Sequence, residues 1–581
     1  MPPPLLPPCR PPAAPLPPLT VQHSSAAPWH SHCCPAAQRA ARGGTFTWPI
    51  FPGPHEPTSE QFNNVMHICV KHFKKLYSGV FFDVHRKDEP EPVHVQIGSD
   101  VSDLPASRKT SGLLSFTSKF FMCDNCETHF YDLIVPDAFD STKRDPWRYL
   151  KYAFRAHDAS EEVAEEISRR RGVRYSTMDE LVNWLPGVTG LFDLMHAIFG
   201  TTIKHLCKNI LWKNGMVNSK QTEKITKFFN GLIWPPSISR LPPSVARGAG
   251  SIKADQWRSQ ISVFFVALFD AWQVNGEIPD IDAEPSPPNT KNANAQATQE
   301  KLVRARMREH LLATKPDASE EELESIDTIK MDRSLRRHYE TVVQFTAAVR
   351  IITSNSISPN EVRRGCRALE LAVQSWARMH CHLVPYFHFA ALHLEEQFLK
   401  HGPAPGWWTY PYERNNGFLG RFNHNGHSGG ELEGTMMRGW WKTTLIQDLI
   451  SRLEAIENPG PEDRDSLNVL NSYLKGGTSE RKDAIDFPKF SQQQSLQQLG
   501  SGYYKLVFDY LKVFWSSEVQ LVPDVSLVAN SNQHSFSGNV RAFSHCWVGR
   551  RRHGAETQAQ GKSAQYAYID IRIPVRISHI F

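Results

Sequence analysis

Two pairs of residues have the types and spacing of metal ligands. Cys123 and Cys126 are separated by two residues, and two thiolates at this spacing can hold one tetrahedral zinc ion. His388 and His393, five apart near the end of an expected helix, can supply the other half of a Cys₂His₂ site. A redox CxxC needs a thioredoxin-like context and a deaminase needs Pro before the first Cys, where Met122 stands. Because the pairs lie far apart in sequence, spacing alone cannot join them, and two half-buried helix histidines remain the alternative.

Acidic residues at the ends of expected elements form a second set of candidates. Asp103 lies at the end of an expected strand, a position that can hold Mg²⁺ in metal-dependent nucleases but that is also common in turns. Asp193, three residues before His196, opens an apolar helix, where a carboxylate is favoured by the helix dipole alone. Glu413 stands among aromatic residues and is either a ligand for a divalent ion or an ion-pair partner of Arg414 or of another base. Each residue therefore has both a catalytic and a structural interpretation.

Basic clusters offer contacts for phosphate. Arg550, Arg551 and Arg552 lie in a region with strand signals and are candidates for DNA binding, as is Arg414. A second cluster, Arg169–Arg171, is more typical of a solvated helix face.

The elements that must position these residues change in character along the chain. Residues 1–44 are rich in proline and predict a disordered segment. Residues 45–130 predict short strands around one helix that follows Thr58; the strands are expected at 45–54, at 80–84 and from 93 through Ile97. Residues 131–384 predict an α-helical block with a mobile loop at about 277–299. The helices expected in this block include 191–212, 254–274, 333–354 and 359–380. Residues 385–456 predict further helices, 457–490 a linker, and 491–581 a small β-rich domain with strands at 519–522, 540–548 and 564–573. The expected fold class is α+β and mostly helical.

Composition excludes some classes of protein. Of the 581 residues 40% are hydrophobic and 22% charged, so buried cores can form and global disorder is excluded. The longest strongly apolar run, Ile261–Trp272, is too short to cross a membrane. A net charge of +5 permits nucleic-acid binding without requiring it, and ten scattered cysteines fit a reducing compartment.

Six segments, taken in order, resemble the CACTA (En/Spm, Tnp2-like) DNA transposases of the type found in fungi. The resemblance runs from about Trp48 to Ile456, and more weakly through Ala564–Ile571. The segments are Phe51-Pro-Gly-Pro-His-Glu-Pro-Thr58, Asp103-Leu-Pro-Ala-Ser-Arg-Lys-Thr-Ser-Gly112, Cys123-x-x-Cys126, Asp193-x-x-His196, His388-x₄-His393 and Tyr410-Pro-Tyr-Glu-Arg-Asn-Asn-Gly-Phe-Leu419.

The resemblance implies an RNase H-like core that is interrupted by a large α-helical insertion. It implies DDE chemistry, in which Asp103 and Glu413 are two of three acidic ligands for catalytic Mg²⁺. It also implies that Cys123, Cys126, His388 and His393 bind one structural zinc ion, as in related recombinases, and that Asp193 and His196 form an auxiliary motif near the active site. The same spacing of 20 residues separates Asp103 from Cys123 and His393 from Glu413.

One departure from the family bears on activity. The first catalytic Asp of the family precedes the Pro-Gly-Pro turn, and residues 1–44 contain no acidic residue. We therefore expect an incomplete core and a transposase-derived protein whose ancestral reaction, metal-dependent cleavage and transfer of DNA strands at transposon ends, is impaired. The alternatives are a non-catalytic DNA-binding or scaffold protein derived from a transposase, and an unrelated helical interaction protein. The family implies DNA as partner and a nuclear location, and leaves a homo-oligomer open.

Overall fold

The computed structural model describes residues 56–83, 88–139, 142–234, 238, 252–420, 422, 430–474, 489–490, 494–514, 520–523, 533–543, 545–548 and 551–554. The expectations for 1–44, for the strand before Pro54 and for a strand at 564–573 lie outside these residues. Within them the protein is mostly helical, as expected.

The first part of the chain alternates helices with very short strands. Its strands are β1 (Val80–Phe82), β2 (Glu91–Val93), β3 (Asp100–Ser102) and β4 (Gly190–Phe192), and its α-helices are α2 (Ser59–Ser78), α3 (Leu104–Thr110), α4 (Pro146–His157), α5 (Glu161–Arg171), α6 (Ile203–His205) and α7 (Ser219–Gly231). Short 3₁₀-helices are η1 (Phe130–Ile134), η2 (Pro136–Phe139) and η3 (Thr177–Glu180), and π-helices are η4 (Met195–Thr202) and η5 (Leu206–Lys213).

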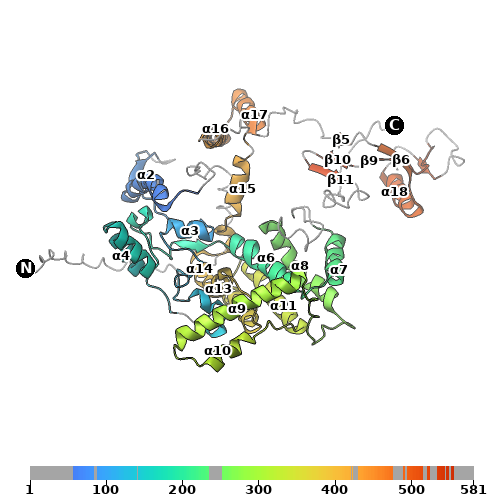
Figure 1. The fold of residues 1–581 in the computed structure, drawn as a ribbon. Helices are drawn as coiled ribbons and strands as arrows, with labels where there is room; N and C mark the ends of the chain where they lie inside the picture. The colour runs from blue at the N-terminus through green and yellow to red at the C-terminus, as the bar shows by residue number, and fades with distance from the viewer. Residues whose placement is uncertain are drawn as a thin grey trace, which may run out of the picture.

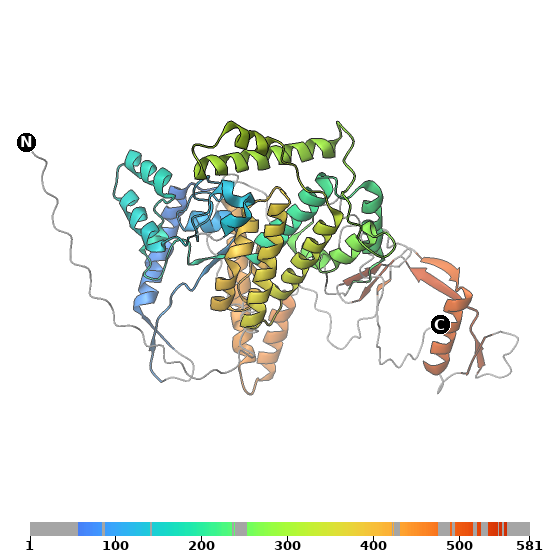
Figure 2. The same ribbon diagram turned by 90° about the horizontal axis from the view of Figure 1, so that it is seen from below.

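The middle of the chain is a helical body. Its helices are α8 (Ala254–Trp272), α9 (Lys291–Thr314), α10 (Glu320–Asp327), α11 (Leu335–Ile352), α12 (Pro359–Arg378), α13 (Pro385–Leu392) and α14 (Leu394–His401), followed by the 3₁₀-helix η6 (Ala404–Gly406). Large buried side chains fill its centre, with the rings of Phe345 and Trp376 5.3 Å apart between α11 and α12. Figure 2 shows α9 and α10, in yellow-green, lying along one side of this body.

Helix α15 (Tyr410–Leu419) leaves the body and leads to α16 (Glu431–Glu454) and α17 (Pro461–Leu474), which pack against each other (Figure 1). Residues 457–490, for which the sequence predicts a linker, therefore contain α17. The C-terminal part has the strands β5 (Lys489–Phe490), β6 (Gln494–Gln498), β7 (Gln520–Val522), β8 (Gln533–Ser535), β9 (Asn539–Phe543), β10 (His545–Val548) and β11 (Arg551–Gly554), with one helix, α18 (Ser501–Phe514). The strand expected at 519–522 is found as β7, whereas the region expected as one strand at 540–548 contains two, β9 and β10, which belong to different sheets. Helix α18 is not predicted.

Local chemistry explains where several elements begin. Thr58 and Gln61 form a reciprocal capping box at the start of α2, and Asp103 caps α3 by accepting a hydrogen bond from the Ala106 amide at 2.8 Å. Thr290 caps α9 at Lys291, so residues 277–299, for which the sequence predicts a mobile loop, instead include the first turns of a helix.

The sheets before residue 475 are two pairs among the described residues. β1 pairs with β2 in antiparallel fashion, and β3 pairs with β4 in parallel, with Val101 opposite Leu191. The strand expected through Ile97 ends at Val93, because the amide of Val95 donates to the carbonyl of Leu76 at the end of α2 instead of to a strand. These pairs do not amount to an RNase H sheet, so that part of the expected fold stays a proposal.

Candidate metal centre

The two cysteines lie in a tight turn between η1 and the end of α3. Arg144 fixes this turn, because its Nε donates to the carbonyl oxygens of Cys123 and Cys126 at 3.0 and 2.7 Å. The amide of Asn125 points toward the Cys123 sulfur at 3.4 Å. Both thiols are free and almost fully buried, so they face the protein interior rather than solvent.

His388 lies on α13, and His393 lies at the break between α13 and α14. In one continuous helix, residues five apart point about 140° away from each other. Here α13 ends at Leu392 and α14 begins at Leu394, and His393 at the break has φ −113° and ψ −2°. The break lets His393 and His388 face the same place.

All four side chains converge. One ligand atom from each of Cys123, Cys126, His388 and His393 lies within 4.8 Å of the others. The Cys123 sulfur is 3.2 Å from His393 Nε2, and the Cys126 sulfur is 3.2 Å from His388 Nε2. Burial lowers the pKa of His388, which favours the neutral ring that binds metal. Two thiolates and two imidazoles gathered in a buried cluster suit a metal ion such as zinc.

The candidate acids lie at the ends of β3 and β4. Asp103 follows β3 directly and Asp193 follows β4 directly. Since the two strands are parallel and Ser102 lies opposite Phe192, the two acidic residues leave the same edge of the sheet side by side. The sequence places Asp103 at the end of the strand expected through Ile97; in the structure Asp103 does follow a strand, but this is the separate strand β3.

Both carboxylate oxygens of Asp193 accept hydrogen bonds. It is 3% exposed and accepts from the Thr409 amide at 2.8 Å, from the Thr409 hydroxyl and from Nδ1 of His196 at 2.6 Å. Burial alone would raise the pKa of Asp193, but the hydrogen bonds from His196 and Thr409 outweigh it and lower the pKa below its usual value. Asp193 is therefore a buried anion that fixes its neighbours.

His196 lies between two acidic residues that are far apart in the sequence, Asp193 and Glu413. With Nδ1 bound to Asp193, its Nε2 lies 3.9 Å from an oxygen of Glu413 on α15. Burial alone would lower the pKa of His196, but Asp193 raises it, with smaller contributions from the charges of Asp103 and Glu413. Asp103, Asp193 and Glu413, which together form the acidic cluster, thus all raise the pKa of one imidazole ring. Glu413 and Arg414 lie on the exposed side of α15.

Phe192 connects the candidate metal centre with the acidic residues. The ring of Phe192 stacks on Phe389 of α13 at 4.3 Å, and the Phe192 amide donates to Gln397 of α14 at 3.1 Å. Phe192 is the residue before Asp193, so the helices that carry the histidines contact the end of the strand that carries the acid. Tyr386, whose pKa is raised to about 12 by burial, also feels the charges of Asp103 and Asp193.

The basic clusters either make contacts within the fold or extend beyond the described residues. Arg169 and Arg170 pair with Glu166 on the same helix, and Arg171 lies over the ring of Tyr152 at 4.7 Å. Arg550 is not among the described residues, and Arg551 and Arg552 belong to β11. Their role in DNA binding stays a prediction.

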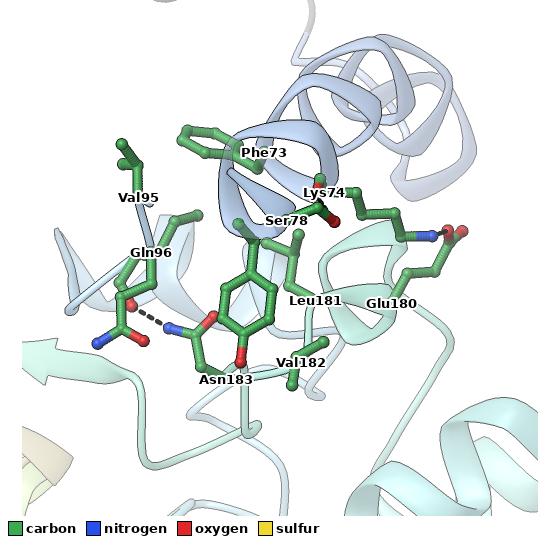
Figure 3. A pocket seen from close by; sticks show the side chains of 11 residues that line it. Phe73, Lys74, Ser78, Val95, Gln96, Glu180, Leu181, Val182 and Asn183 are labelled. Atoms are coloured by element: carbon green, nitrogen blue, oxygen red, sulfur yellow. Dashed lines mark hydrogen bonds and ion pairs between the residues drawn. The ribbon is translucent and has the colours of Figure 1, made fainter. Parts of the chain in front are cut away.

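A separate hollow of about 270 Å³ lies at the end of α2 (Figure 3). Phe73, Val95 and Leu181 line it, Lys74 and Glu180 form an ion pair at its edge, and the Asn183 side chain donates to the carbonyl of Ile97. Its lining includes no residue of the metal centre or of the acidic cluster.

Comparison of the sequence with protein-family models and with curated proteins finds no match. No helix among the described residues is long and apolar enough to cross a membrane.

Sequence reasoning missed the residues that support the site. Thr409, Gln397 and Tyr386 are ordinary residues in sequence, and only their contacts give them a role. Thr409 lies just before the Tyr410–Leu419 segment, which is the only sequence signal that could have drawn attention to it.

Proposed function

We propose that this chain is a transposase-derived protein of the DDE class with an incomplete RNase H-like core. The convergence of Cys123 and Cys126 with His388 and His393 carries the proposal, because the sequence could not pair these two halves and only a returning chain brings them together. Asp103 lies 20 residues before Cys123, and Glu413 lies 20 residues after His393. Both acids lie near His196. An unrelated helical protein would have no reason both to join the four ligands and to place the two acids near one histidine.

In this proposal, zinc at the Cys₂His₂ centre ties the two ends of the helical insertion together. Such a tether orients the neighbouring acids through their surroundings, as outer contacts orient ligands in metal sites. Phe192 and Gln397 transmit the position of the histidine helices to the end of β4. A structural role for zinc is consistent with four protein ligands, which leave no open position for substrate.

In this proposal the residues of the acidic cluster and their neighbours have different roles. Mg²⁺ ions, when bound, would activate the attacking oxygen and stabilise the leaving oxygen of a phosphodiester. Asp103 accepts from the Ala106 amide through one carboxylate oxygen, which leaves the second oxygen to bind a metal ion. Glu413, half-exposed on α15, provides a second carboxylate. Asp193 and Thr409 hold the His196 ring so that Nε2 faces Glu413 and can hold a proton there.

Metal binding and DNA cleavage test this function directly. We expect the full chain to bind Mn²⁺ and to cleave duplex DNA slowly in Mn²⁺ or Mg²⁺. Asp103→Asn and Glu413→Gln should each weaken Mn²⁺ binding by roughly 10–100-fold and abolish cleavage. Glu454→Gln, an exposed acid at the end of α16, serves as the matched control and should change neither.

The results separate the proposal from its alternatives. DNA binding with no Mn²⁺ affinity and no cleavage would support a non-catalytic DNA-binding or scaffold protein. Absence of zinc, Mn²⁺ and DNA binding together would reject a transposase origin and leave a helical interaction protein.

A further inference from the structure

Arg108 is a buried cation whose side chain connects α3 with the turn that contains Cys123 and Cys126, here called the cysteine turn. Its side chain is almost completely buried, and Nη1 donates to the carbonyl oxygens of Leu114 and Phe121 at 2.8 and 2.9 Å. Nη2 donates to the carbonyl of Met122 and lies 3.8 Å from Oδ1 of Asp124. One guanidinium therefore contacts the residues on both sides of Cys123.

The same residue belongs to the helix that Asp103 begins. α3 is only seven residues long, and Asp103 caps it through the Ala106 amide. Since Arg108 lies in the last turn of this helix, a shift of the cysteine turn must move α3 or break buried hydrogen bonds. A buried cation that loses its acceptors costs more than an exposed one, so the helix should follow the turn.

The surroundings of α3 transmit such a shift to β4 as well. A Cβ atom at Gly190, the first residue of β4, would lie 2.5 Å from the Ser107 hydroxyl oxygen, and a Cβ atom at Gly187 would lie 2.9 Å from the carbonyl oxygen of Asp124. The turn, the helix and the strand are thus in close contact at these glycines. Close-packed elements of this kind move together rather than deform.

We propose that Arg108 is a positioning residue that couples the Cys₂His₂ centre to Asp103. Metal binding fixes the turn, Arg108 carries this constraint to α3, and α3 holds the Asp103 carboxylate at the sheet edge. The part of this inference that concerns metal at Asp103 rests on the proposed function; the coupling of the turn to α3 does not.

Arg144 provides a matched control within the same turn. It donates to the carbonyl oxygens of Phe120, Cys123 and Cys126, but it lies before α4 and not on α3. Arg144 should therefore support the turn without connecting it to Asp103. A role in folding alone would make the two arginines equivalent.

The test measures α3 and the acids while zinc is added or removed. In the full wild-type chain, removal of zinc by a chelator should speed amide hydrogen exchange in residues 104–110 and weaken Mn²⁺ binding about fivefold or more. Arg108→Gln should still bind zinc, but its α3 should exchange rapidly with or without zinc, and its Mn²⁺ affinity should no longer respond to zinc. Arg144→Gln should bind zinc more weakly and keep the response of α3 once zinc is saturating.

An additional variant and the separate readouts distinguish failure of the coupling from failure of the proposed function. If Arg108→Gln does not fold, Arg108→Lys retains the charge but lacks the planar fork of donors that joins the carbonyls of Leu114, Phe121 and Met122, and it should show a reduced response. If wild-type chain binds zinc but no Mn²⁺, the proposed function fails while hydrogen exchange still decides the coupling. An Arg108→Gln variant whose α3 responds to zinc as in wild type overturns the inference.

Discussion

The sulfur of Cys126 lies 3.2 Å from Nε2 of His388, although 262 residues separate them along the chain. The elements from η1 to α12, including most of the helical body, lie between these two residues in sequence. Two thiols and two imidazoles that meet in this way close a very large loop. Closing such a loop costs entropy that grows only slowly with its length, so a metal ion with four ligands can offset it.

Zinc content is the first prediction. We expect the purified chain to contain about one zinc ion, and Cys123→Ser or His388→Ala to remove it, because a tetrahedral site with three ligands binds far more weakly. Elemental analysis measures the content, and thermal unfolding should show a zinc-dependent rise in stability in the wild type only. Cys69→Ser, a half-buried cysteine on α2, is the control and should retain the metal. A folded wild-type chain without zinc affinity would contradict the prediction.

The pair of Asp193 and His196 predicts a titration. Because Asp193 raises the pKa of His196, the stabilisation from this pair is complete below the ordinary histidine pKa of about 6.5 and is lost as pH rises through the raised value. Asp193→Asn should lower the pKa of His196, measured by NMR of its ring proton, and should cost about 2–4 kcal/mol of unfolding free energy. Asp448→Asn, which breaks an exposed pair with Arg452, should cost less than about 0.5 kcal/mol. An unchanged His196 pKa in Asp193→Asn would show that the hydrogen bond does not control the ring.

Asp179 predicts a different pH dependence. Its side chain is 4% exposed, one oxygen accepts from the Ser176 amide at 3.0 Å, and the other has no hydrogen-bond partner among the described residues. Burial raises its pKa to about 7, so the folded chain retains a proton that the unfolded chain loses near pH 4. The unfolding free energy should therefore fall as pH rises between these values. Asp179→Asn should remove this part of the slope in denaturant unfolding measured from pH 4 to 8, whereas Asp317→Asn, an exposed control, should leave it intact.

Gly112 tests the packing just after α3. It has φ +65°, and a Cβ atom there would lie 2.3 Å from the carbonyl oxygen of Arg174. We expect Gly112→Ala to destabilise the chain by about 2 kcal/mol or more, since neither the backbone angle nor the carbonyl can accommodate it. Gly98 has no described atom within 4 Å of such a Cβ, so Gly98→Ala should change unfolding free energy by about 0.5 kcal/mol or less. Equal effects of the two substitutions would show that the contact is not maintained in solution.

The long helices were predictable because their apolar residues repeat at helical spacing. α8, α11 and α12 begin and end within a few residues of the predicted positions, since each has a clear apolar face and α12 has a Ser358 cap. The strands were harder, because β1 to β4 are three residues long and too short for an alternating pattern. Residues 191–212, for which the sequence predicts one helix, begin instead with β4, since Gly190 and Leu191 pair with β3.

The metal centre was predictable only as two separate halves. Each half has a recognisable spacing, but the contact between them depends on the packing of a helical body that the sequence does not describe. The role of Asp193 was unresolved for a similar reason. Its partner Thr409 lies 216 residues away, and no local pattern connects them.

The order of synthesis gives the metal centre one further property. At roughly 5–20 residues per second, a ribosome needs about 13–52 s to reach His388 after Cys126 has been made. During this time the nascent chain contains the two sulfurs but neither of the two imidazoles. A site with all four ligands would therefore form only after His393 has been made, and it would link two segments that are synthesised far apart in time. Under the proposed function, cells short of zinc should accumulate chains that are helical but lack this link.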